Sequence, residues 1–170
     1  MNHRLWTIWF LSFIAAVAVY VWFSSADLPH VMGSHFNAAG QADAYMPRNA
    51  YRNFYVGLML GLPLLVVFLP NALIRRTTAA FNLPHRDYWL APERRARTVD
   101  VLCRMSFGFG YLLVGFLGYV HWLVIRANHI RPPGFPSDWF ISGLIVFIGS
   151  VILWMFLHLR RFFRVPQSGA

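Results

Sequence analysis

Four long apolar stretches constrain the fold of this chain more than any other feature. None contains an acidic residue, and they cover residues 5–23, 54–74, 102–125 and 139–159. About 20 apolar residues in a helix cross the roughly 30 Å hydrocarbon core of a bilayer. Because 58% of the chain is hydrophobic and only 12% is charged, a water-soluble domain would expose large apolar patches. We therefore predict an all-α membrane protein with four transmembrane helices in a single integral membrane domain, residues 1–170.

The first stretch has the length of a transmembrane helix. A signal peptide has an apolar core of about 7–15 residues, whereas this run is longer and rich in Trp. Ser24, Ser25 and Ala26 resemble a small-residue cleavage site, so cleavage stays open as an alternative that leaves the other three spans unchanged.

The arginines predict the orientation of the helices. All fifteen basic residues are Arg, and with the amino terminus inside the cell eleven lie in cytoplasmic segments: Arg4, Arg75, Arg76, Arg86, Arg94, Arg95, Arg97, Arg104, Arg160, Arg161 and Arg164. The outer segments hold the other four: Arg48, Arg52, Arg126 and Arg131. Because an excess of Arg and Lys marks the cytoplasmic side, we expect both termini in the cytoplasm. The partner of this charge is the lipid bilayer, and we expect no nucleic-acid partner, because no basic stretch is separate from a membrane boundary.

The outer loop, residues 24–53, is longer than a simple connection between two helices requires. Loops beyond about 12–15 residues are usually functional or disordered. This loop contains regular turn residues, namely Pro29, Gly33, Gly40 and Pro47. We therefore expect an ordered cap on the outer face of the membrane.

The outer loop also carries candidate ligand-binding side chains, His35, Asn37 and Asp43, with His30 nearby. His35 and Asp43 are the candidates for a metal site, since both residue types bind zinc, but their spacing matches no metal motif. We therefore expect no metal and no other cofactor. We expect instead a turn in which Asn37 and Asp43 accept hydrogen bonds from backbone amides.

The inner loop, residues 75–101, predicts a cytoplasmic extension of the third helix. Pro92 suits the first position of a helix, and Glu93 suits its positive amino-terminal end. Pro84 and Pro92 bound residues 85–91, which we expect to be an extended segment.

Two uses of this run stay open. The first turns of the extension would lie at the lipid headgroups, where the membrane-anchoring candidates are Tyr88, Trp89, Arg94, Arg95 and Arg97. Glu93 would pair with Arg97 one turn later. Alternatively, His85, Asp87 and Glu93 would form an acid–base catalytic site, for which the sequence identifies neither a nucleophile nor a substrate pocket.

Small and polar residues within the spans give two further expectations. The third span contains four glycines that would let helices approach closely, Gly108, Gly110, Gly115 and Gly118. His121 lies near the outer end of the third span and His158 near the inner end of the fourth. At a rise of about 1.5 Å per residue they are roughly 20 Å apart in depth, so they are not a haem-binding pair. We expect each to be a hydrogen-bonding group near an interface.

The segment LPHVMGSHFNAAGQADAYMPR resembles the signature of the SdpI-type immunity protein family, which is built on a domain of unknown function. The matching residues are Leu28, Pro29, His35, Asn37, Gly40 and Asp43, whereas Gly33 and Arg48 depart from the family's usual Pro and Lys. The resemblance covers the first half of the chain, and family members can have additional spans. It implies a multi-pass protein of the bacterial plasma membrane that confers immunity to a secreted peptide toxin or signals its presence. It also implies a ligand-binding set that comprises His35, Asn37, Gly40 and Asp43.

The sequence thus favours a non-enzymatic membrane protein that recognises an extracellular ligand through its outer loop. The partner would be a secreted peptide or another membrane protein. The alternatives are an enzyme that acts on lipid or peptide at a membrane face, and a small subunit of a larger membrane complex.

Overall fold

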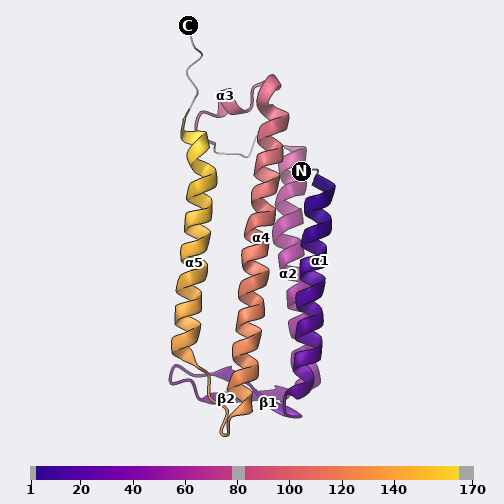
Figure 1. Ribbon diagram of the computed structural model, residues 1–170, viewed down its shortest axis with the longest axis vertical. Helices are drawn as coiled ribbons and strands as arrows, with labels where there is room; N and C mark the ends of the chain where they lie inside the picture. Colours follow the sequence, from indigo (N-terminus) through magenta and orange to yellow (C-terminus); the bar gives the residue numbers. More distant parts are fainter. Residues whose placement is uncertain (1–2, 78–82, 165–170) are drawn as a thin grey trace.

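The computed structural model describes residues 3–77 and 83–164, and four long helices account for most of them (Figure 1). They are α1 (His3–Ser24), α2 (Arg48–Arg76), α4 (Pro92–His129) and α5 (Ser137–Leu159). Each is long and apolar enough to cross a membrane, which confirms the number and place of the predicted helices. Every helix also continues into polar residues beyond its apolar stretch, at one end or at both.

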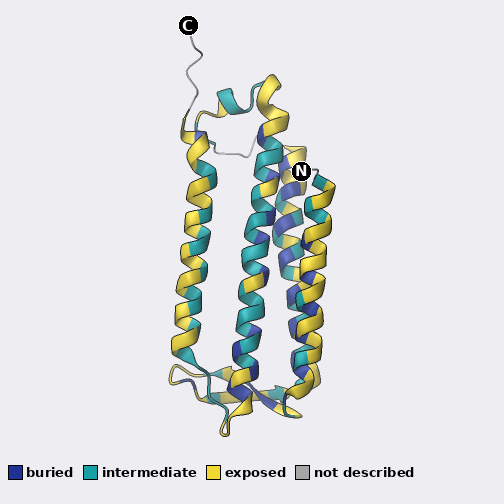
Figure 2. Ribbon diagram, viewed as in Figure 1, coloured by how far each residue is buried: buried dark blue, intermediate teal, exposed yellow. Residues whose placement is uncertain are grey.

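Helices α1, α2 and α4 form the core of the protein. Their buried residues face one another in Figure 2, and the largest include Phe10, Ile14, Met59, Val67, Phe107 and Val114. Helix α5 lies beside α4, and none of its residues is buried. It is held partly by a stacked pair of rings, Phe116 and Phe147, whose centroids are 4.5 Å apart. The exposed apolar surface of α5 suits contact with lipid.

The glycines of α4 permit close helix approach at three of the four predicted positions. A Cβ at Gly108 would lie against the Trp154 ring of α5, and one at Gly110 would lie against Phe10 of α1. A Cβ at Gly118 would be 3.2 Å from Val17 of α1. At Gly115 the prediction is wrong, since a Cβ there would meet nothing within 4 Å.

The loop between α1 and α2 is ordered, as expected, but it contains a two-stranded antiparallel sheet. A short 3₁₀ turn, η1 (Ser25–Asp27), leads into β1 (Val31–Phe36), which pairs with β2 (Ala42–Pro47). The hairpin lies across the ends of α2 and α4, and we call this the hairpin end of the protein (Figure 1). The opposite end, where α1 begins and α2 ends, is called the arginine-rich end.

The connection before α4 differs from the extended segment expected over residues 85–91. Residues Arg86–Trp89 form one helical turn, α3, and His85 before it adopts a left-handed conformation with φ of 51°. Helix α4 does begin at Pro92, which confirms that the third helix extends ahead of its apolar stretch.

The ion pair in the first turns of α4 is also different from the expected one. It joins Asp100 to Arg104, and no ion pair between Glu93 and Arg97 exists among the described residues.

Candidate functional site

The hairpin presents one face to the helix ends and the other to solvent. Met32 is fully buried and Met46, opposite it on β2, is half-buried, so these side chains pack toward the helices. The next residues in each strand point the other way. Val31 is 63% exposed and Tyr45 is 54% exposed. This alternation gives the hairpin an outer face that is accessible to a ligand.

His35 and Asp43 meet on this outer face. The distance between His35 Nδ1 and Asp43 Oδ1 is 2.5 Å, and the two side chains are 70% and 44% exposed to solvent. The carboxylate of Asp43 therefore pairs with the imidazole, and the prediction that it caps backbone amides is wrong. Within residues 3–77 and 83–164, no group of three or more His, Cys, Asp or Glu side chains is arranged to hold a metal ion.

Asn37 and Gly40 build the turn between the strands. The Oδ1 atom of Asn37 accepts hydrogen bonds from the backbone N–H groups of Ala39 and Gln41, both at 3.0 Å, which confirms the predicted role of Asn37. Gly40 has φ of 76°, a conformation that favours glycine. Its carbonyl accepts a 2.7 Å hydrogen bond from the N–H of Phe135, so the turn is tied to the loop between α4 and α5. Among the predicted ligand-binding residues, Gly40 therefore shapes the turn through its backbone and offers no side chain to a ligand.

Hydrogen bonds fix the hairpin, and the segment that precedes it, to the helices. The amide of Asn128 on α4 pairs with the backbone of Gly33, accepting from its N–H at 2.7 Å and donating to its carbonyl at 3.0 Å. Arg48, at the start of α2, donates to the carbonyls of Ala26 and Leu28. The outer face of the hairpin is therefore held at a fixed position relative to α2 and α4.

We expect Asn128→Ala to release the hairpin, because the buried N–H and C=O of Gly33 would both lose their partner. The cost is about 2–3 kcal/mol of unfolding free energy, the usual penalty for buried backbone groups left unpaired. Amide hydrogen exchange should accelerate in β1 and β2 more than in the middle of α2. The matched control is Asn53→Ala, because Asn53 is exposed on α2. Unchanged exchange in β1 would contradict the anchoring role of Asn128.

A buried polar cluster lies beneath the hairpin and was not predicted as a unit. His121 of α4 is fully buried, with its Nε2 atom 2.8 Å from Ser24 Oγ and its Nδ1 atom 2.8 Å from the Tyr51 hydroxyl. The Tyr51 ring stacks on the imidazole, and the Tyr55 and Tyr20 rings pack around it. The cluster therefore joins α1, α2 and α4 at the hairpin end.

The sequence alone marked His121 only as a hydrogen-bonding group near an interface, and its hydrogen bonding is confirmed. His158 is far from it and bonds the carbonyl of Trp154 within α5 at 2.8 Å. The sequence signal that could have found the cluster is the recurrence of Tyr20, Tyr51 and Tyr55 near the same ends of two spans.

The acid–base candidates His85, Asp87 and Glu93 lie on the exposed surface at the arginine-rich end. In the described part of the chain, no hydrogen bond or ion pair joins any two of them. The geometry therefore adds no support to a catalytic site there.

Three of the predicted anchoring residues, Tyr88, Trp89 and Arg94, take part in a small folded unit around α3. Trp89 Nε1 donates to the carbonyl of Phe162 at 3.1 Å, and Thr98 Oγ1 donates to the carbonyl of Trp89 at 2.8 Å. The guanidinium of Arg94 lies 4.1 Å from the centre of the Tyr88 ring. Arg95 and Arg97 are exposed on the same turns of α4.

Comparison of this chain with family models, with curated proteins and with solved structures gives no match.

Proposed function

We propose that this chain is a non-enzymatic, multi-pass protein of a bacterial plasma membrane whose hairpin binds an extracellular ligand. The hairpin end would face outward and both termini would lie in the cytoplasm. The distribution of Arg supports this orientation, because eleven arginines belong to segments at the arginine-rich end and four to segments at the hairpin end. The resemblance to SdpI-type immunity proteins adds a candidate ligand, a secreted peptide toxin.

The observation that carries this proposal is the accessible His35–Asp43 pair on a firmly held hairpin. A charge-capable pair offers hydrogen bonds to a ligand, while Val31 and Tyr45 on the same face offer apolar contact. Because Asn128 already fixes β1, and Arg48 fixes the segment that precedes it, little conformational entropy would be lost when a ligand binds.

The backbone of the hairpin supports a peptide as the ligand. Both polar groups of Gly33 point toward Asn128, away from β2. In an antiparallel pair the opposite residue, Tyr45, then turns its own N–H and C=O away from β1, toward the outer edge of β2. An extended peptide can add to such an edge as a further strand, while Asp43 and Tyr45 contact its side chains.

Survival of a sensitive bacterium challenged with secreted peptide toxins tests this function. Cells would carry the wild-type protein, His35→Ala, Asp43→Ala or an empty vector, with membrane abundance measured by immunoblot. We expect protection by the wild type, reduced about tenfold or more in either variant, because each substitution removes one partner of a charged hydrogen bond.

Asn49→Ala is the matched control, since Asn49 is exposed at the start of α2 and outside the strands. Full protection by both hairpin variants at equal abundance would contradict the proposed site. A wild-type protein that protects against none of the peptides would favour an enzyme or a subunit of a membrane complex instead.

A further inference from the structure

The arginine-rich end contains a defined cavity that the proposed function does not use. Its volume is about 370 Å³, and it lies where α3, the first turns of α4 and the 3₁₀ turn η2 (Arg160–Phe163) meet. The cavity is lined by Tyr88, Trp89, Arg94, Arg97, Thr98, Val101, Arg161 and Phe162. Two regions distant in sequence, residues 88–101 and residues 161–162, thus contribute to one concave surface.

The walls of this cavity are held in place by specific contacts. The buried Phe162 packs edge-on against Trp89 with ring centroids 5.3 Å apart, and the Trp89 indole donates to the Phe162 carbonyl. The Arg94 guanidinium stacks on Tyr88, and Arg161 Nε donates to the carbonyl of His158 at 2.8 Å. The side chains of Arg94 and Arg161 are therefore oriented by the protein.

The positive charge in the cavity is not neutralised by the described protein. Among residues 3–77 and 83–164, no Asp or Glu forms an ion pair with Arg94, Arg97 or Arg161. Three guanidinium groups without carboxylate partners, around an aromatic wall, suit a phosphate group, which accepts hydrogen bonds from the forked donors of Arg.

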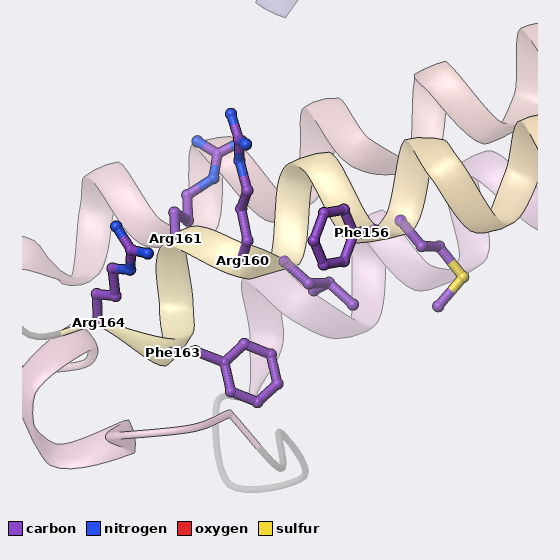
Figure 3. Close-up of a pocket in the computed structure, with 7 residues that line it drawn as sticks. Phe156, Arg160, Arg161, Phe163 and Arg164 are labelled. Atoms are coloured by element: carbon purple, nitrogen blue, oxygen red, sulfur yellow. The ribbon is translucent and has the colours of Figure 1, made fainter.

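A second cavity adjoins the first through the shared residue Arg161. Its volume is about 960 Å³, and it is lined by Met155, Phe156, Leu159, Arg160, Arg161, Phe163 and Arg164 (Figure 3). In Figure 3 the Arg160 and Arg161 side chains extend to the same side, while Phe156 lies farther along α5. The arginines suit the charged headgroup of a lipid, and the apolar residues of α5 beside them suit its acyl chain. A free anion would use only the arginines.

We infer that these two cavities form one binding site for an anionic membrane phospholipid. The phosphate lies among Arg94, Arg97 and Arg161, and an acyl chain follows the apolar residues of α5 toward Phe156. The site is selective for an anionic headgroup because five arginines line the two cavities, Arg94, Arg97, Arg160, Arg161 and Arg164. Such a lipid connects α3, α4 and the end of α5, which otherwise has no buried residue over Ser137–Leu159.

Native mass spectrometry of the purified protein in mild detergent tests this site. The protein is incubated with equal amounts of phosphatidylglycerol and phosphatidylcholine, and bound lipid is counted. We expect preferential retention of phosphatidylglycerol, weakened about tenfold by Arg97→Gln and by Arg161→Gln, because each removes a charged hydrogen-bond donor. Arg95→Gln is the matched control, because Arg95 lines a different cavity with Arg75. It should change retention by less than about twofold.

Three results would overturn the inference. Equal retention of the two lipids would remove headgroup selectivity. An effect of Arg95→Gln as large as that of Arg97→Gln would indicate diffuse attraction by net charge. Displacement of phosphatidylglycerol by millimolar inorganic phosphate would identify a soluble phosphate as the occupant. Thermal unfolding of each variant in the same detergent separates loss of lipid from loss of fold.

Discussion

Replacing Gly110 by Val will cost about 3 kcal/mol or more of unfolding free energy, because the new side chain has no space. A Cβ at this position would be 2.7 Å and 2.8 Å from two ring carbons of Phe10, and nearer still to Val67. Both neighbours are fully buried. The Phe10 ring is itself confined by edge-to-face contacts with Phe107 and Tyr111, at centroid distances of 5.6 Å and 5.3 Å. The contact between α1, α2 and α4 must therefore open.

The measurement is thermal unfolding of the purified variant in mild detergent, followed by circular dichroism. Gly115→Val is the matched control on the same helix, because a Cβ at Gly115 would meet nothing within 4 Å. It carries the same change in helix propensity and should alter stability by about 0.5 kcal/mol or less. Equal losses in the two variants would mean that backbone effects of Val, not contact with Phe10, determine the outcome.

These two glycines illustrate how far the sequence predicts the packing. Four glycines in a transmembrane helix indicate that other helices come close, since small side chains permit it. Which glycine faces a neighbour depends on the rotation of α4 about its axis, which no local pattern in an apolar helix specifies. Gly110 faces Phe10, whereas Gly115 faces open space.

The start of α4 was predictable because its determinants are local. The N–H groups in the first turn of a helix have no partner within the helix, so Pro92, which has no N–H, loses nothing at this position. Its ring disfavours α-helical geometry only at the preceding residue, Ala91. Ala91 is indeed extended, with φ of −53° and ψ of 145°. The extended conformation expected over residues 85–91 is therefore wrong for residues 86–89. A proline restricts the residue before it, so Arg86–Trp89 were free to form a helical turn.

The candidate site was predictable only in its short-range parts. His35, Asn37, Gly40 and Asp43 are near one another in sequence, and the turn brings them together. Neither the strands nor the anchor at Asn128 followed from local patterns. Asn128 is 95 residues from Gly33, and its role depends on how the helix ends meet.

The largest polar effect is expected at His121. We expect His121→Leu to cost about 3 kcal/mol of unfolding free energy, measured by the same thermal unfolding. The imidazole is fully buried and bonds two hydroxyl groups, of Ser24 and Tyr51. Hydrogen bonds between membrane helices contribute about 0.6 kcal/mol on average and up to about 1.7 kcal/mol, and the Tyr51 hydroxyl left without a partner adds a desolvation cost. His158→Leu is the matched control and should cost less, because its bond lies within its own helix.

The proton arrangement of the His121 cluster follows from counting donors. The Ser24 hydroxyl has one proton, which it donates to the carbonyl of Tyr20 at 2.6 Å. Its oxygen must therefore accept from His121 Nε2–H, and in a neutral imidazole His121 Nδ1 then accepts from the Tyr51 hydroxyl. Each of these four polar groups has a partner in this one tautomer, so the three helices are joined by a continuous hydrogen-bonded chain.

A double-mutant cycle distinguishes this chain from simple packing. Tyr51→Phe keeps the stacked ring and removes only the hydroxyl, so it should cost about 1 kcal/mol alone and little once His121 is already Leu. The coupling energy of about 1 kcal/mol is then the contribution of the hydrogen bond itself. Additive losses would show that His121 stabilises the helices by filling space. The hydrogen bond between His121 and Tyr51 would then contribute nothing to the free energy of unfolding. Coupling would instead establish that a polar chain beneath the hairpin fixes the ends of α1 and α2 that the hairpin joins.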